Sequence, residues 1–458
     1  MKTLIQNGTL VLPDGERTDN LWLEDGTIAA IGGSGPTDCT VLDAAGCLVF
    51  PGFIDPHTHL EMDNGVTVTA DDFASGTAAA LAGGTTCLID FATQARGGTL
   101  TDALALWHSR AAGRSSCDYG FHMAITDWNA QTASELPQML REGVSSFKLY
   151  MAYDNLRVSD AAIYETLRAV GALGGIVGVH CENGELINEL TAGLRAGGQL
   201  SPRAHPLAHP AAIEAEAAER LFTIAELADT PVLMVHLSTA RGLEAVRRAR
   251  ERGVKVYAES CPQYFLLDDS RYRLPDFEGA KYVCSPPLRQ KADQAALWRA
   301  LEQGEIDTLA TDHCSFNQKG QKELGRYDFS LIPNGLPGIE HRPAAMFTAA
   351  VGSGRLSPTR LMRLMSEQPA KLYGLFPQRG TIAVGSQADL VVWDPAAEWT
   401  ITADRQLQRV DYTPYEGMPL RGRAKAVLLH GVLAAENGRV TQAGLGRYAA
   451  RKTPQFYR

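Results

Sequence analysis

Two histidines, one residue apart, follow a short apolar run in the stretch Phe50-Pro-Gly-Phe-Ile-Asp-Pro-His-Thr-His-Leu60. Residues i and i+2 of a strand project to the same face, so the imidazoles of His57 and His59 point toward one place. Neutral imidazole is a common ligand of zinc and similar divalent metals. The pair by itself is equally consistent with two neighbouring loop histidines. It predicts a metal site only if the rest of the chain supplies further ligands.

Four more polar side chains stand at or near the ends of later apolar runs: Lys148, His180, His236 and Asp312. A single histidine after a strand is more often a hydrogen-bonded structural residue than a ligand. Four histidines, one lysine and one aspartate in such positions form a pattern that chance explains poorly. We expect the remaining histidines to be structural, with His313 a candidate to support its neighbour Asp312: His108, His122, His205, His209, His313, His341 and His430.

The runs that end in these residues belong to a longer alternation of strand and helix patterns. Apolar runs recur eight times, at 53–54, 86–90, 120–125, 146–150, 176–180, 232–236, 254–259 and 307–312. Helical patterns separate them, among others at 161–173, 211–228 and 243–252. Eight such units predict an α/β fold, a (β/α)8 TIM-like barrel with its chemistry at the C-terminal strand ends. A doubly wound open sheet is the alternative, and the polar residues at so many run ends favour the barrel.

The two chain ends carry a different pattern, in which short strands alternate with glycine-rich turns such as Asp14-Gly15 and Asp25-Gly26. The N-terminal strands are too few for a stable sandwich, and strands near 389–393 and 426–430 can complete the sheet. We therefore predict a small discontinuous β-sandwich domain made from both ends, residues 1–50 and 377–445. The barrel would occupy residues 51–376, and residues 446–458 would form a mildly basic, solvated tail.

Composition and charge narrow the class of protein. The chain has 458 residues, 45% of them hydrophobic and 21% charged, as in an ordinary globular enzyme. Its formal net charge of -9 argues against a nucleic-acid or anionic-membrane partner. Neither a signal peptide nor a run of 18 apolar residues is apparent. The eight scattered cysteines fit buried thiols, so we expect a cytoplasmic protein.

Several longer motifs surround the polar residues. They are Ser146-Phe-Lys-Leu-Tyr150, Val179-His-Cys-Glu-Asn183, Val235-His-Leu-Ser238, Ser260-Cys-Pro-Gln-Tyr264, Ala310-Thr-Asp-His-Cys314, Pro333-Asn-Gly-Leu-Pro-Gly338 and Asp411-Tyr-Thr-Pro-Tyr-Glu-Gly417. As a set and in this order, together with the first histidine pair, they resemble the amidohydrolase superfamily. Within it, the closer resemblance is to the dihydropyrimidinase/hydantoinase family of cyclic amidases, and it covers nearly the whole chain.

The resemblance implies a binuclear metal centre. His57, His59 and Asp312 would bind one divalent ion and His180 and His236 the other, with zinc as the default and manganese or cobalt as alternatives. Lys148 would be N-carboxylated, because a carbamate offers two anionic oxygens for bridging and an ammonium has no lone pair to give. A buried strand end favours the neutral amine that reacts with carbon dioxide. A salt-bridged barrel lysine is the alternative.

The same resemblance implies hydrolysis of the ring amide of hydantoins or 5,6-dihydropyrimidines to N-carbamoyl amino acids. Two metals about 3.5–4 Å apart would activate a shared hydroxide. Asp312 would move the proton to the leaving ring nitrogen. Tyr153 would donate to the developing oxyanion, and main-chain groups of Ser285 and Asn334 would hold the ring. The resemblance also suggests a homotetramer.

Alternatives share this scaffold. Dihydroorotase and allantoinase use similar metals, but dihydroorotase-like chains carry an arginine two residues after the second histidine, where this chain has Glu61. That difference argues for a neutral ring. A non-catalytic scaffold relative would have lost ligands, whereas all six are present here.

The segment that leaves the first strand, residues 60–69, is expected to wall the pocket. Met62, Val66 and Val68 are apolar, but Asp63, Asn64 and Gly65 interrupt them. If the polar trio faces the pocket, small rings such as dihydrouracil should be favoured, because burying an unpaired carboxylate is costly. If it faces solvent, the apolar residues can receive a bulky ring substituent.

Overall fold

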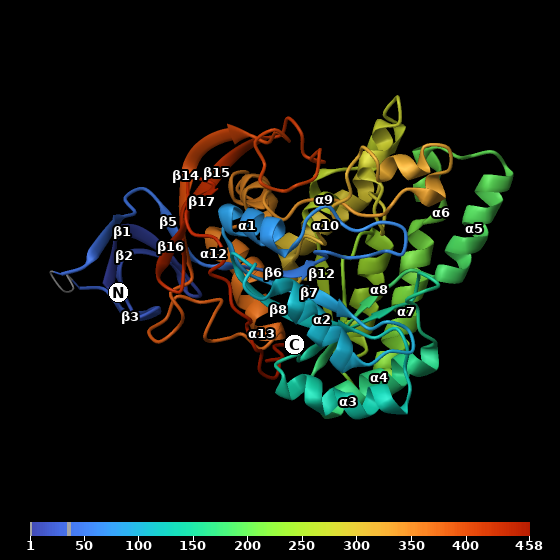
Figure 1. Cartoon of the computed structure of the whole chain (residues 1–458), viewed down its shortest axis with the longest axis horizontal. Coiled ribbons are helices and arrows are strands. Elements are labelled where there is room, and N and C mark those ends of the chain that lie inside the picture. The colour runs from blue at the N-terminus through green and yellow to red at the C-terminus, as the bar shows by residue number, and fades with distance from the viewer. Residues whose placement is uncertain (1, 34–37) are drawn as a thin grey trace.

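Two sheets organise the chain, a parallel barrel and a mixed sheet built from both chain ends. The computed structural model describes residues 2–33 and 38–458. Figure 1 shows the blue N-terminal strands beside the orange-red C-terminal strands at one side of the molecule, with the barrel and its helices on the other. The combination of barrel and composite β-domain predicted from the sequence is confirmed. Among the helices of the described residues, none is long and apolar enough to cross a membrane.

The barrel contains eight parallel strands, each coinciding with a predicted apolar run. They are β6 (Phe53–Thr58), β7 (Thr85–Thr93), β8 (Asp118–Ala124), β9 (Ser146–Tyr150), β10 (Ile176–His180), β11 (Val232–Met234), β12 (Val256–Ser260) and β13 (Thr308–Leu309). Strands that follow each other in sequence pair with each other, from β6 to β13. A parallel bridge between Thr58 and His313 joins the two ends of this path. The barrel is therefore closed at the C-terminal ends of its strands.

Helices alternate with these strands and cover the outside of the barrel. They are α1 (Phe73–Gly83), α2 (Leu100–Ala111), α3 (Ala130–Arg141), α4 (Asp160–Ala172), α5 (Gly184–Ala196), α6 (His205–Ala208), α7 (Ala211–Ala228), α8 (Ala240–Glu251), α9 (Pro262–Leu266), α10 (Lys291–Gln303), α11 (Arg342–Met346), α12 (Pro358–Met362) and α13 (Gln368–Leu372). Polar side chains start several of them; the Thr239 hydroxyl, for example, accepts from the Gly242 N–H of α8. The predicted helical segments correspond to α4, α7 and α8.

Within the described residues, the second sheet has nine strands. They are β1 (Lys2–Leu12), β2 (Gly15–Glu24), β3 (Thr27–Ile31), β4 (Thr40–Asp43), β5 (Leu48–Pro51), β14 (Leu390–Thr400), β15 (Pro419–Leu429), β16 (Val432–Glu436) and β17 (Arg439–Val440). β5 pairs antiparallel with β14, which joins the two chain ends in one hydrogen-bonded path. Apolar side chains from both ends share one buried core. Met1 and residues 34–37 of the predicted N-terminal part lie outside the described residues.

The C-terminal segment matches the predicted solvated tail only in part. Arg451 is only 4% exposed, and its guanidinium donates to the Ser146 hydroxyl at 2.5 Å and to the Phe121 carbonyl. Arg458 forms an ion pair with Asp307 at 2.7 Å. Ser146 begins β9 and Asp307 directly precedes β13, so these two partners lie at the N-terminal ends of barrel strands, opposite the predicted site. The expectation was therefore wrong for Arg451, which buried polar groups bind, whereas Arg447 and Lys452 are exposed as expected.

Candidate active site

The carboxyl ends of the barrel strands surround one large cavity. Its volume is about 650 Å³. All nine residues singled out from the sequence line it: His57, His59, Lys148, Tyr153, His180, His236, Ser285, Asp312 and Asn334. Most of them come from strand ends or from the loops that follow, because parallel strands present their carboxyl ends at one rim. Lys148, expected at a strand end, lies instead in the middle of β9. The fold thus brings together residues that lie up to 277 positions apart in sequence, from His57 to Asn334.

The first histidine pair and Asp312 form a cluster suited to a metal ion. The Nε2 atoms of His57 and His59 each lie 3.2 Å from Oδ1 of Asp312. All three ligand atoms fall within 4.8 Å of one another. Two imidazole nitrogens and a carboxylate oxygen are a donor set that zinc-like ions accept. This part of the cavity is therefore a metal-binding site by its chemistry.

The second histidine pair faces the same cavity. Nδ1 of His180 lies 2.9 Å from Nε2 of His236. The other ring nitrogen of His236 is buried and, within the described residues, has no hydrogen-bond partner. Two imidazole nitrogens that converge in a buried place also fit a divalent ion.

Lys148 lies between these two pairs in sequence and lines the same cavity floor. Its side chain is 1% exposed, and burial lowers its pKa to about 8. Within the described residues, no carboxylate forms an ion pair with it; its Nζ instead lies 5.2 Å from the ring centre of Phe91 and 5.1 Å from that of Tyr150. A bare ammonium is costly in such surroundings. Asp312 and Glu259 act on Lys148 electrostatically, but neither forms an ion pair with it, so the alternative of a salt-bridged lysine has no partner among the described residues.

Three of the predicted site residues adopt left-handed backbone conformations. The φ angles are 52° at Asp312, 38° at His236 and 67° at Tyr153. Residues other than glycine rarely occupy this region, and they persist there only where the surrounding structure holds them. The backbone conformation that directs these three side chains into the cavity therefore has a cost in conformational free energy.

Two buried glutamates support the histidines from behind, and sequence reasoning did not select them. Oε1 of Glu259 lies 2.7 Å from Nδ1 of His57, and Oε2 of Glu182 lies 2.9 Å from Nε2 of His180. Each contact fixes the ring so that its other nitrogen faces the cavity. A signal was available: Glu182 follows His180 by two residues, and Glu259 ends a predicted apolar run.

The environments of the two glutamates differ. Burial raises the pKa of Glu259 to about 8. Burial also acts to raise the pKa of Glu182, but the imidazoles of His209 and His180 outweigh it and hold that pKa well below the usual range. His209 lies 3.0 Å from Glu182. Glu259 thus supports His57, and Glu182 supports His180. Of these two glutamates, Glu182 also contacts a second histidine, His209.

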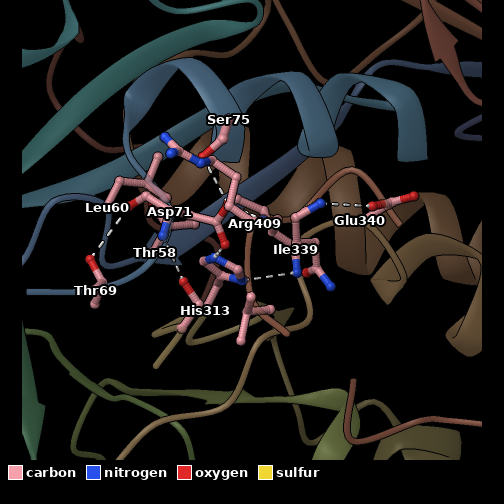
Figure 2. A network of polar contacts seen from close by, with 12 residues as sticks. Thr58, Leu60, Thr69, Asp71, Ser75, His313, Ile339, Glu340 and Arg409 are labelled. Carbon is pink, nitrogen blue, oxygen red and sulfur yellow. Dashed lines mark hydrogen bonds and ion pairs between the residues drawn. The ribbon is translucent and has the colours of Figure 1, made fainter. Parts of the chain in front are cut away.

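His313 anchors the backbone beside Asp312. Its carbonyl accepts from the His59 N–H at 2.8 Å, and its Nδ1 accepts from the two N–H groups of residues 338–339. Its Nε2 lies 3.2 Å from Oδ2 of Asp71, which Figure 2 shows within a network that reaches α1. The expected support of Asp312 is therefore indirect, since His313 fixes the main chain on either side of the cluster.

Three predicted residues for the substrate line the cavity near the metal ligands. The Asn334 side-chain amide donates to the Ser285 hydroxyl at 3.1 Å, so the two loops that carry these residues are in contact. Burial raises the pKa of Tyr153 well above its usual value. Its hydroxyl therefore keeps its proton near neutral pH and is available as a hydrogen-bond donor.

The loop of residues 60–69 lines the cavity with both polar and apolar residues. Asp63 and Asn64 are at the wall, but their oxygens accept from backbone N–H groups of the same loop, at 2.8 Å from Gly65 and 2.9 Å from Thr67. Other segments, which the sequence did not suggest, complete an apolar wall. Its large apolar residues are Met62, Val66, Leu106, Trp107, Leu156, Leu324, Leu331 and Ile332.

The barrel, the composite sheet and the histidine–aspartate cluster together define a metal-dependent hydrolase. The chain belongs to the amidohydrolase family, whose model matches residues 48–434. That span includes the whole barrel and most of the C-terminal strands.

The comparisons with individual proteins narrow the resemblance within this family. The chain is 46% identical over 455 residues to a D-hydantoinase of Geobacillus stearothermophilus, which covers 98% of this chain and 97% of the relative. It is 42% identical to a D-hydantoinase of Streptomyces coelicolor, with 99% of both chains covered. A crystal structure of dihydropyrimidinase from Brevibacillus agri superposes with a TM-score of 0.98 at 44% identity and covers 100% of both chains.

Proposed function

We propose that this protein hydrolyses the ring amide bond of cyclic ureides, hydantoins or 5,6-dihydropyrimidines, to N-carbamoyl amino acids. The cluster of His57, His59 and Asp312 at the cavity floor is the observation that carries the proposal. Full-length similarity to D-hydantoinases and to a dihydropyrimidinase supports the choice of substrate. Because these hydantoinases are named for the D-series, we also propose a preference for D-substituted rings.

The cavity floor is proposed to hold two divalent ions. His57, His59 and Asp312 would hold the first, His180 and His236 the second, and a carboxylated Lys148 would bridge them. We propose zinc, with manganese or cobalt as alternatives, since the donor set suits all three. When bound, the ions would supply a water nucleophile activated near neutral pH and a Lewis acid for the ring carbonyl.

The protein's own groups would hold the ring and move the proton. Oδ1 of Asp312 faces both histidines, which leaves Oδ2 to take the proton from the attacking water and pass it to the ring nitrogen. The Tyr153 hydroxyl would donate to the carbonyl oxygen as negative charge develops there. Main-chain groups of Ser285 and Asn334 would bind the alternating N–H and C=O edge of the ring.

The dihydroorotase alternative requires a cation for the substrate carboxylate. At the position where that family carries arginine, Glu61 forms an ion pair with Arg114 at 2.7 Å. Glu61 is thus paired and does not line the cavity, so this position offers no cation to an anionic ring. The division into residues 1–50 with 377–445, 51–376 and 446–458, and the homotetramer, stay predictions.

A substrate panel tests the proposed activity. Metal-loaded protein should open hydantoin, 5-substituted hydantoins and dihydrouracil, and N-carbamoyl products should appear by mass spectrometry. Allantoin and dihydroorotate serve as the contrasting rings. Turnover of either of these, with hydantoin and dihydrouracil left intact, would replace the proposal by the corresponding alternative.

The ring substituent provides a second prediction. The loop oxygens of Asp63 and Asn64 are already hydrogen-bonded, and the rest of the cavity wall is largely apolar. Burying a phenyl group against such a wall is favourable. We expect the specificity constant for 5-phenylhydantoin to exceed that for unsubstituted hydantoin by roughly tenfold. Equal or lower values for the phenyl compound would mean that the polar loop residues control the pocket.

A further inference from the structure

Lys322 is a buried cation that the proposed reaction does not use. It opens a short 3-10 helix, Lys322–Gly325, and its side chain is fully buried. Its Nζ donates to the carbonyl of Val283 at 2.9 Å and to the carbonyl of Pro333 at 2.9 Å. Within the described residues, no carboxylate forms an ion pair with it. Its partners among the described residues are therefore two main-chain carbonyls.

Both carbonyls belong to segments proposed to hold the substrate ring. Val283 precedes Ser285 by two residues, and Pro333 immediately precedes Asn334. The two segments also touch directly, since the Gly335 N–H donates to the same Val283 carbonyl at 3.0 Å. Lys322 thus contacts two segments that also contact each other and that are about 50 residues apart in sequence. Its ammonium fixes how far apart the two segments lie.

Keeping the Lys322 ammonium charged in this space is costly. Burial disfavours the charged ammonium and lowers the pKa of Lys322 to about 8. The two carbonyl dipoles offset only part of that cost. A buried charge with few partners contributes little to stability, but its directional contacts can specify one arrangement of the surrounding backbone. The buried position of Lys322 is therefore better explained by its effect on the arrangement of the surrounding backbone than by a contribution to the stability of the fold.

We propose that Lys322 is a positioning residue for substrate binding. It holds the main-chain groups of Ser285 and Asn334 at the spacing that the N–H and C=O edge of a cyclic ureide requires. This inference rests on the proposed function and adds a residue to it that makes no contact with the metal ligands named above. Loss of the ammonium should weaken ring binding, while the metal centre and the proton transfer remain.

The test compares Lys322→Met with Lys319→Met. Methionine has a similar length and no donors, and Lys319 is an exposed lysine three residues earlier, so its variant is the matched control. With hydantoin, Lys322→Met should raise KM about tenfold or more and change kcat less, because a lost pair of charge-assisted hydrogen bonds affects ring placement. Metal content per chain should equal that of the wild type and of Lys319→Met.

The possible outcomes separate this inference from the proposed function. Wild-type protein that leaves hydantoin and dihydrouracil intact overturns both. An active wild type with an unchanged KM in Lys322→Met overturns the positioning role alone, as does a variant that loses metal together with activity. If Lys322→Met does not fold, Lys322→Gln, which keeps an amide donor, is measured instead. Failure of both variants to fold would assign Lys322 a structural role and reject the proposal.

Discussion

Replacing Lys148 by alanine should remove most of the bound metal and nearly all ring hydrolysis. The side chain is buried at the cavity floor without a carboxylate partner in the described part of the chain, and its lowered pKa of about 8 favours the amine that reacts with carbon dioxide. Without the proposed carbamate, the two histidine pairs would lose their common anionic ligand. We expect turnover to fall by roughly a thousandfold or more, since the metals supply several kcal/mol of barrier lowering.

Metal analysis and steady-state kinetics measure this effect together. Lys319→Ala, an exposed lysine outside the cavity, is the control and should keep wild-type metal content and turnover. A small carboxylic acid added to Lys148→Ala should restore part of both, because it can take the place of the carbamate oxygens. Two metals per chain and full turnover in the alanine variant would show that Lys148 is not the bridge.

Asp312→Asn should slow turnover by a factor on the order of 100 or more while metal is retained. The asparagine oxygen can still face His57 and His59 as Oδ1 does, but the amide cannot take up the proton from the attacking water. The substitution should add no backbone strain that would itself lower turnover. The φ of 52° at this position suits asparagine, which occurs in the left-handed region several times more often than most residues.

The matched control for this variant is Asp63→Asn, which changes a cavity-lining carboxylate whose recorded hydrogen bond is to Gly65. Its kcat should stay close to that of the wild type. Both variants are compared at saturating hydantoin, with metal content measured on the same samples. A loss below tenfold in Asp312→Asn, with metals retained, would assign the proton transfer to another group.

The barrel and the positions of its polar residues could be predicted because parallel strands are buried on both faces. Such strands appear as continuous apolar runs, and their carboxyl ends meet at one rim. The spacing of His57 and His59 therefore already predicted that both imidazoles point to the same side of the strand. The polar residues Lys148 and His180, within and at the end of apolar runs, predicted the same rim without any knowledge of which strands are neighbours.

The second layer of the site depends on tertiary contacts that local sequence does not encode. Glu259 supports His57 from 202 positions away, and Lys322 connects segments on either side of it. Charged residues are mostly exposed, so sequence alone predicts an exposed position for both. In the structure, Glu259 and Lys322 are buried. The same reversal accounts for Arg451, whose basic surroundings predicted a solvated tail but whose guanidinium lies at the base of the barrel.

The binuclear centre itself is tested most directly by anomalous diffraction from crystals of zinc- and bicarbonate-loaded protein. We expect two zinc peaks roughly 3.5–4 Å apart, one beside His57 and His59 and the other beside His180 and His236. We also expect electron density for a carboxyl group on Nζ of Lys148, between the two peaks. A single peak beside Asp312, with an unmodified Lys148, would contradict this expectation.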